Sequence, residues 1–497
     1  MPARLCTLPM IAALLASAAT ALARPLDQDP YVADPVFWSG MYKLDARGQG
    51  PQNGSAWAQQ VIRLVNGEVI AAGRTPASAL FSTDANNVGL SRYDALGQSV
   101  SGPWHTLDWP DDPGAVYTDV AALRRWGDRL FVLADAVGAS PGQRMVVLHA
   151  FDLASGGLLQ TSVALQGAAD FSGAGLTIVD HGSVGTRLVV AGTLRQGGIG
   201  RIALRRYTLD AAGAFSVDGP VQLPAVGVCT GSQDCQVTAI ASAGGSIGAP
   251  PRLYVAGTFL WGGAPSRDFF VARLDAGLQP DSGGFGALGM AVVGFDEPGS
   301  GNEDILVALA VQNVGSAAVP DDRVYLVGNV SRSCRPGIGV ARLGHGGGLD
   351  GAFGSGGRLL FGGSGLDAGH PDCPLARTDT ARAAVLSPAD GRLAIVGSAT
   401  ACAQPPCTVQ THGMSAIVDA GDGTLRDHRE LPFLFQGVAD RETVLAAVAG
   451  NGAGRVIAAG WVRFPNDFVQ PGLAGKRRWV LLGLARDRIF GNGLQPQ

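Results

Sequence analysis

Residues 253–257 read Leu-Tyr-Val-Ala-Gly, a short apolar run that ends in glycine. Runs of this kind occur seven times along the chain: Val69–Gly73, Phe131–Asp135, Leu188–Gly192, Leu253–Gly257, Val324–Gly328, Leu393–Gly397 and Val456–Gly460. Their last residues are 62, 57, 65, 71, 69 and 63 positions apart. Such even spacing of one short pattern indicates an internal repeat, in which each unit packs on its neighbours.

The fifth repeat shows the unit most clearly. Its expected strands are Ile305–Val311, Arg323–Val330, Gly337–Leu343 and Arg358–Phe361. Short strands with glycine-rich turns and no helical periodicity predict an all-β unit. Four antiparallel strands that recur seven times are typical of a seven-bladed β-propeller.

The repeat period sets the expected domain organisation: a signal peptide over 1–23, a single propeller domain over 24–490 and a C-terminal tail over 491–497. The blades are expected at about 55–115, 116–168, 169–232, 233–301, 302–376, 377–439 and 440–490. The last repeat ends after Arg486 without a fourth strand, whereas Val36–Asp45 resembles a repeat strand with no partners before it. We expect this N-terminal strand to close the ring, because pairing removes an open sheet edge.

Two positions of the repeat have a structural interpretation. The glycine that ends the second strand is expected where another backbone approaches closely, which would let adjacent blades pack. Asp135 replaces this glycine in the second repeat, so we expect that blade to be locally distorted or its loop to differ. Aspartates that follow several third strands, such as Asp275, are expected to accept hydrogen bonds from the next backbone amides in a turn.

The N-terminus resembles a secretory signal peptide. Arg4 precedes the apolar run Leu8–Ala19, and Ala21-Leu22-Ala23 follows it. This order predicts cleavage after Ala23 and a periplasmic or secreted protein. The alternative is a transmembrane anchor, for which the run is too short. No later segment is long and apolar enough to span a bilayer, and we expect a monomer.

Composition excludes one class of partner. The chain has a net charge of −4 and only two lysines, and it lacks basic clusters. Nucleic acid is therefore not expected as a partner.

Six cysteines follow the signal peptide, and an even number in an exported chain predicts disulfides. Cys229 with Cys235, and Cys402 with Cys407, would close local loops, which leaves Cys334 with Cys373. The alternative is zinc bound with His370 or His412, but no cysteine pair has the two-residue spacing of a zinc knuckle.

Two repeats carry a family resemblance. The fourth and fifth repeats resemble the bacterial delta-60 repeat. The matching segments are Arg252–Gly257 and Phe269–Asp275 in the fourth repeat, and Val324–Gly328, Gly339–Leu343 and Leu349–Gly357 in the fifth. That family has an apolar strand ending in Val-Ala-Gly, an Ala-Leu-Ala-Arg-Leu strand and a Leu-Asp-x-x-Phe-Gly-x-Gly-Gly turn. The resemblance implies a propeller-like exported protein and implies no activity and no catalytic residues.

Motifs of known chemistry are absent. The sequence has no Gly-x-Ser-x-Gly elbow, and its seven histidines form no His-Glu-x-x-His pair. Acidic residues recur just before the first strand of several repeats: Asp119, Asp234, Glu303 with Asp304, Asp379 and Glu442. They could ring the mouth of the central channel and attract a cation such as calcium. Alternatively, each carboxylate caps amides at a strand start, as the neighbouring threonines suggest. The acidic loop Asp296–Asp304 matches no EF-hand, so a solvated loop is the simpler interpretation.

Function is expected in the loops of one face, because variable loops on a rigid scaffold carry binding sites. The leading hypothesis is a binding or scaffold protein that recognises a protein or glycan. Trp261 and Trp461 lie in long connections between second and third strands and could supply flat apolar surface, or pack between blades. A lyase or hydrolase in the channel with a bound cation is one alternative, and a structural surface protein is another. No cofactor is expected beyond such a cation.

Overall fold

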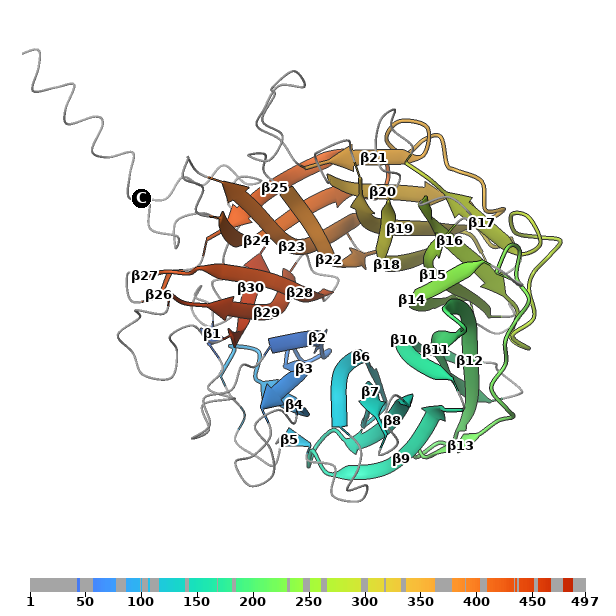
Figure 1. The fold of residues 1–497 in the computed structure, drawn as a ribbon, viewed down its shortest axis with the longest axis horizontal. Coiled ribbons are helices and arrows are strands. Elements are labelled where there is room, and N and C mark those ends of the chain that lie inside the picture. Colours follow the sequence, from blue (N-terminus) through green and yellow to red (C-terminus); the bar gives the residue numbers. More distant parts are fainter. Residues whose placement is uncertain are drawn as a thin grey trace, which may run out of the picture.

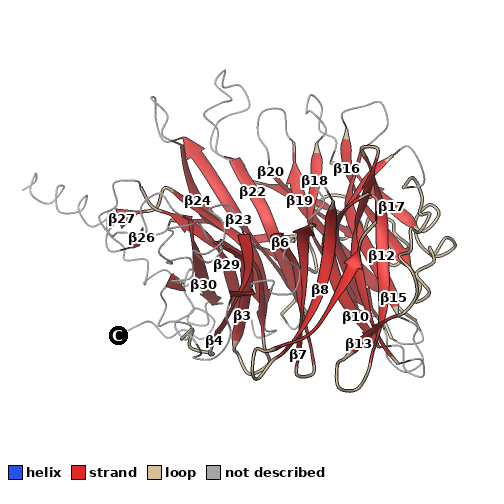
Figure 2. Cartoon of the chain, turned by 60° about the horizontal axis from the view of Figure 1, so that its bottom comes forward, coloured by secondary structure: helices blue, strands red, loops and turns tan. Residues whose placement is uncertain are grey.

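The structure of the chain is a computed structural model. It describes residues 43–44, 57–76, 86–98, 100, 106–107, 116–138, 143–167, 169–180, 185–229, 233–244, 251–260, 266–295, 303–316, 319–331, 337–362, 378–388, 390–402, 409–432, 434–435, 438–450, 455–465 and 477–485. Strands are the regular elements of this part of the chain (Figure 2). No helix of a length and hydropathy suited to crossing a membrane occurs in it.

Five four-stranded antiparallel sheets follow one another along the chain. The first contains β2 (Trp57–Arg63), β3 (Val69–Pro76), β4 (Asn86–Tyr93) and β5 (Thr106–Leu107). The second contains β6 (Val116–Trp126), β7 (Arg129–Val137), β8 (Arg144–Asp152) and β9 (Leu158–Leu165). The third contains β10 (Asp170–Asp180), β11 (Thr186–Gln196), β12 (Ile199–Leu209) and β13 (Phe215–Val217).

The next two sheets repeat this order. They contain β14 (Asp234–Ala243), β15 (Arg252–Leu260), β16 (Arg267–Leu274) and β17 (Met290–Val293), then β18 (Asp304–Asn313), β19 (Asp322–Val330), β20 (Gly337–Leu343) and β21 (Arg358–Phe361). In every sheet each strand pairs with the next one along the chain.

The remaining strands form an eight-stranded sheet and a short hairpin. One part of the sheet contains β22 (Thr378–Ser387), β23 (Arg392–Cys402), β24 (Val409–Asp419) and β25 (Leu425–Leu431). The other contains β28 (Glu442–Gly450), β29 (Arg455–Arg463), β30 (Arg477–Ala485) and β1 (Lys43–Leu44). A single parallel bridge, Thr411 to Glu442, joins the two parts. The hairpin pairs β26 (Leu434–Phe435) with β27 (Val438–Ala439).

The sheets stand around a common axis, with the first strand of each nearest to it (Figure 1). Neighbouring first strands contact one another in the order β2, β6, β10, β14, β18, β22, β28 and again β2. The expected all-β propeller of four-stranded antiparallel blades is confirmed. Where the last sheet meets the first, β1 from the N-terminal part of the chain pairs with β30. In this pairing Lys43 lies opposite Leu481, and Leu44 lies opposite Val480.

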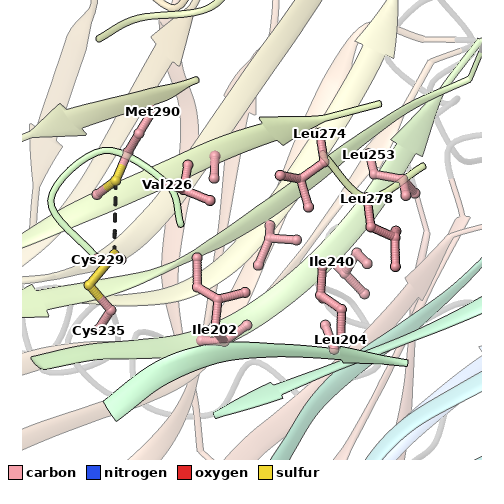
Figure 3. Packing of buried hydrophobic residues seen from close by; sticks show 14 of the residues in the cluster. Ile202, Leu204, Val226, Cys229, Cys235, Ile240, Leu253, Leu274, Leu278 and Met290 are labelled. Carbon is pink, nitrogen blue, oxygen red and sulfur yellow. Dashed lines mark hydrogen bonds between the residues drawn. A yellow bond between two sulfur atoms is a disulfide. The ribbon is translucent and has the colours of Figure 1, made fainter. Parts of the chain in front are cut away.

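Hydrophobic clusters lie between successive sheets rather than inside them. In Figure 3, Ile202 and Leu204 of β12 face Ile240 of β14 and Leu253 of β15 in one such cluster. Another cluster joins the first sheet to β28–β30, where Trp479 is fully buried. Each sheet therefore buries both faces against its neighbours, and apolar burial drives the closure of the ring.

The repeated glycine lies opposite a β-bulge in its own sheet. Gly257 of β15 pairs with Val237 of β14, directly before a shift in the register of β14. A Cβ atom on Gly257 would lie 1.9 Å from the carbonyl oxygen of Gln236. A Cβ atom on Gly397 or Gly460 would likewise lie 1.9 Å from a carbonyl oxygen of the first strand of its sheet. Close backbone approach was expected here, but the backbone belongs to the same blade and not to an adjacent one.

The second sheet departs from this pattern, as the sequence predicts. Asp135 of β7 stands opposite Asp119 of β6, and β6 carries two register shifts where the other first strands carry one. One shift lies directly beside the Asp119–Asp135 pair, between Tyr117 and Asp119, and the other lies between Val120 and Ala122. The distortion of this blade is therefore a second bulge in its first strand.

Arginines of the third strands connect each blade to the next. Arg206 donates to the carbonyl of Ala276 in the following sheet (3.0 Å), and Arg273 donates to that of His345 (2.5 Å). Arg342 repeats the contact with Ala420 (2.6 Å). Because these carbonyls directly follow the third strand of the next sheet, one arginine position of the repeat ties neighbouring blades together.

Aspartates that follow the third strands form turns, as expected. The Asp275 carboxylate accepts a hydrogen bond from the Gln279 amide (2.9 Å), and that of Asp210 accepts one from Ala214 (2.8 Å). These carboxylates stabilise the turn between the third and fourth strands.

Candidate functional site

One face of the ring gathers the features that the sequence singled out. Asp234, at the start of β14, pairs with Leu260 at the end of β15, and Asp304 pairs in the same way with Val330. First strands therefore begin on the face where second strands end, which we call the start face. The connections from second to third strands leave from this face, as predicted.

The first group of predicted carboxylates binds the preceding blade. Asp234 accepts a hydrogen bond from the amide of Gly200 in β12 (2.7 Å). Asp304, 3% exposed, accepts one from Phe295, which follows β17 (2.7 Å). Asp119 accepts a hydrogen bond from Gln59 of the first sheet. Each carboxylate thus ties its blade to the previous one.

The remaining predicted carboxylates have side-chain partners. Asp379 is fully buried and lies 3.3 Å from Nε2 of His428. Glu442 accepts a hydrogen bond from Arg477 (3.1 Å) and forms an ion pair with Arg463 (3.0 Å). Glu303, whose side chain is 50% exposed, lies 3.7 Å from Arg267.

These contacts give the predicted carboxylates partners on neighbouring strands, and the hypothesis of a carboxylate ring at the channel mouth stays a prediction. None of the six predicted carboxylates is among the described residues that line the axial cavity. For Asp234 and Asp304 the capping interpretation is closer, with the difference that the capped amides belong to the preceding blade. The physical reason is that a buried carboxylate must be hydrogen-bonded, and the neighbouring strand ends supply the donors.

Two equivalent aspartates were missed from the sequence. The Asp440 carboxylate is buried between Thr443 and Nδ1 of His412 (3.4 Å). Its hydrogen bond raises the pKa of His412. Asp170, the first residue of β10, accepts from the amide of Arg144 in β8 (3.3 Å). Their place before a first strand was the signal that could have identified them.

A tryptophan and arginine cluster lies on the start face where the first sheet meets β28–β30. The guanidinium of Arg477 lies over the ring of Trp461 (5.4 Å to the centroid) and over that of Trp57 (5.8 Å). Arg74 lies 4.6 Å from the centroid of Trp57. Trp461 Nε1 donates to Glu442 (3.4 Å). Both tryptophans are half-buried, so each combines packing with exposed surface.

A cavity of about 400 Å³ lies along the axis and is lined by the first strands. Its wall consists mainly of alanine, valine, leucine and isoleucine. Arg124 of β6 and Arg382 of β22 are the charged residues among its described lining. A wall of this kind does not attract a cation.

The described histidines have structural partners. His149 is buried, 2.9 Å from the Tyr117 hydroxyl and 3.0 Å from that of Thr161. Burial lowers the pKa of His149 to about 4, so this side chain is neutral at pH 7. The described part of the chain holds no group of three or more His, Cys, Asp or Glu side chains placed to bind a metal.

One predicted disulfide is present. Cys229 and Cys235 are bonded and buried, and Cys229 Sγ packs 3.9 Å from Met290 Sδ (Figure 3). The other two predicted disulfides fall outside the described part of the chain, which leaves out Cys334, Cys373, Cys407 and the side chain of Cys402. Trp261 and the signal peptide also lie outside them.

Comparisons with known proteins agree with the fold. The family described as "Domain of unknown function (DUF5122) beta-propeller" matches residues 252–283, which include part of the delta-60 resemblance. Comparison with curated proteins finds no significant match.

Several solved structures are similar in fold. The endosialidase of phage phi92 has 10% identity and a TM-score of 0.42, with 92% of this chain and 71% of that chain covered. Sqt1 from Chaetomium thermophilum has 12% identity and a TM-score of 0.40, with 88% and 98% covered. The alpha-L-arabinanase of Penicillium chrysogenum has 11% identity and a TM-score of 0.40, with 88% and 96% covered. At these identities the similarity concerns the fold and assigns no activity.

Proposed function

We propose that the chain is an exported binding or scaffold protein that recognises a glycan or protein partner through its start face. In this proposal the signal peptide is cleaved after Ala23, and the mature chain forms seven blades. The hydrophobic cluster between the first sheet and β28–β30 supports that count, as does the pairing of β1 with β30. Residues Lys43–Leu44 would then supply the fourth strand of the last blade.

The tryptophan and arginine cluster carries the proposal. Two half-buried indole rings offer flat apolar surface, and Arg74, Arg477 and Glu442 place hydrogen-bonding groups around them. Sites that bind small polar ligands combine apolar walls with a few oriented polar groups. This combination favours a glycan over a protein partner. An enzyme with a channel cation is less favoured, because the described channel lining carries guanidinium groups and no carboxylate.

Glycan capture by the purified mature chain tests the proposal. Replacing Trp57 and Trp461 by alanine should abolish capture from a panel of soluble polysaccharides, because it removes both indole surfaces. Trp126 is the matched control, since it is a half-buried tryptophan at the opposite end of its first strand, beside the turn to β7. Trp126→Ala should keep capture, and melting curves should show that all variants fold. Capture that persists in the double variant, or is lost equally in Trp126→Ala, contradicts the proposed binding face.

A further inference from the structure

The axial cavity is a second candidate site, independent of the start face. Its described lining comes from the first strands of all the blades, and its charged members are two arginines. Arg124 lines the channel and is exposed, and it donates a hydrogen bond to the carbonyl of the adjacent Leu123 (3.4 Å). Arg382 is also exposed, and among the described residues neither guanidinium has a carboxylate partner. Two cations therefore face a shared space with no counter-charge from its described wall.

The chain carries a net charge of −4, so this space differs in sign from the chain as a whole. Some arginines of the repeat pair with carboxylates, as Arg342 does with Asp350 (2.9 Å) and Arg206 with Asp218 (2.8 Å). A narrow channel with low-dielectric walls focuses the field of its charges. The walls also raise the cost of leaving a guanidinium without a partner, which is why desolvation lowers the pKa of Arg124. An anion in the channel would remove that cost.

The two arginines approach the axis from nearly opposite sides and at different heights. In the cycle of first strands, β6 and β22 are separated by β10, β14 and β18 on one side and by β2 and β28 on the other. Arg382 lies at the bulge of β22, beside the partner of Gly397. Arg124 pairs with Phe131 of β7. Phe131 lies four residues before Asp135, which holds in β7 the repeat position that Gly397 holds in β23. At about 3.3 Å per residue this offset is roughly 13 Å along the strands.

The rest of the wall suits a small polar molecule. Gln60 and Thr238 are polar members of the lining; Gln60 Nε2 donates to the Ala121 carbonyl (3.0 Å) and Thr238 Oγ1 to the Leu306 carbonyl (3.3 Å), so their oxygen atoms can still accept. The first strands also turn their unpaired edges to the axis, so backbone amides are available as donors. A volume of about 400 Å³ lies within the range of small-molecule sites. Guanidinium groups bind carboxylate and phosphate in bidentate fashion.

We propose that the axial channel binds a small organic anion, with carboxylate or phosphate groups held by Arg124 and Arg382. This site goes beyond the proposed recognition of a partner at the start face. Because the two cations are separated along the axis, a ligand with charge at both ends should bind more tightly than one with a single charge. A neutral molecule of the same size should bind weakly.

Calorimetric titration of the purified chain with a matched series tests this. Glucose, glucuronate and glucarate share a six-carbon skeleton with zero, one and two carboxylates, and glucose 6-phosphate tests phosphate in place of carboxylate. Affinity should rise with each added charge and fall with added salt. Arg124→Gln with Arg382→Gln should weaken glucarate binding at least about tenfold and remove the preference for charge. Arg124→Lys with Arg382→Lys retains the positive charges and should keep the preference at lower affinity.

Arg125 provides the matched control. It follows Arg124 in β6, is exposed, and donates to the carbonyl of Gly127 (2.8 Å) instead of lining the channel. Arg125→Gln should bind glucarate like the parent chain. Equal affinity for glucose and glucarate overturns the proposal, as does the absence of binding by every anion at millimolar concentration. An effect of Arg125→Gln equal to that of the channel variants overturns it too.

Discussion

Asp119 and Asp135 are direct cross-strand neighbours between β6 and β7, and Asp135 occupies the position at which the other sheets place glycine. The Asp135 carboxylate accepts a hydrogen bond from the Gly173 amide of the next sheet (2.6 Å). Gly173 leaves the space for this contact, because a Cβ atom there would lie 2.9 Å from Oδ1 of Asp135. Asp135, which replaces the repeated glycine, therefore connects its blade to the next one by a hydrogen bond.

This pair predicts a pH-dependent stability. Burial raises the pKa of Asp135 to about 7, and the nearby Asp119 adds to the rise. In the unfolded chain the group titrates near 4. The folded protein thus binds more protons between about pH 4 and pH 7, so stability should fall by roughly 2–4 kcal/mol as pH rises through this window and then level off.

Asp135→Asn removes the titrating group and keeps an acceptor for Gly173. Urea unfolding at pH 5.5 and pH 8 should show a smaller pH dependence for this variant and higher stability than the parent at pH 8. Asp210→Asn, at an exposed turn aspartate, is the control and should keep the parental pH dependence. The assignment fails if Asp135→Asn and the parent lose equal stability between the two pH values.

A second prediction concerns the glycine opposite the bulge. Gly257→Ala places a Cβ atom against the Gln236 carbonyl, and a backbone group in a paired strand cannot move aside cheaply. We expect a loss of roughly 1–3 kcal/mol or more in unfolding free energy. Gly283→Ala is the control, because a Cβ atom at Gly283 has no neighbour within 4 Å. Equal stability of the two variants in denaturant titrations would falsify the role given to the bulge.

The sequence predicts the repeat, the four-stranded unit and the irregular second blade because each depends on local pattern. Apolar runs, turn aspartates and a glycine in a strand identify these features without knowledge of distant contacts. The partners of the carboxylates could not be predicted in this way. Asp304 bonds to Phe295 only because a strand end from the preceding blade lies beside it, and neither periodicity nor spacing specifies that contact.

A third prediction concerns the arginine ties between blades. Arg342 is 1% exposed in its side chain and donates to the carbonyls of Ala420 and Gly421, both at 2.6 Å, while pairing with Asp350. Arg342→Gln leaves these buried acceptors without donors and should destabilise the fold by roughly 3–5 kcal/mol.

Thermal and denaturant unfolding measure the loss at Arg342. Arg426→Gln is the comparison, since that arginine is 49% exposed in its pair with Asp419, and its replacement should change stability by less than about 0.5 kcal/mol. If the Arg342 variant is no less stable than the Arg426 variant, the contacts with the next blade contribute nothing to stability.

The last prediction concerns the closure of the ring. β1 pairs with β30 through Lys43 and Leu44, so a chain that lacks residues 24–50 should expose the edge of β30. We expect a clear fall in melting temperature and a greater tendency to aggregate, because an unpaired edge strand is a template for pairing with another chain. Removal of residues 24–35 alone retains the whole expected strand Val36–Asp45 and is the control. Calorimetric melting compares the two deletions with the mature chain. If both deletions melt at the parental temperature, the N-terminal strand does not close the ring. If the shorter deletion is as destabilising as the longer one, the stabilising contacts lie before Val36 instead.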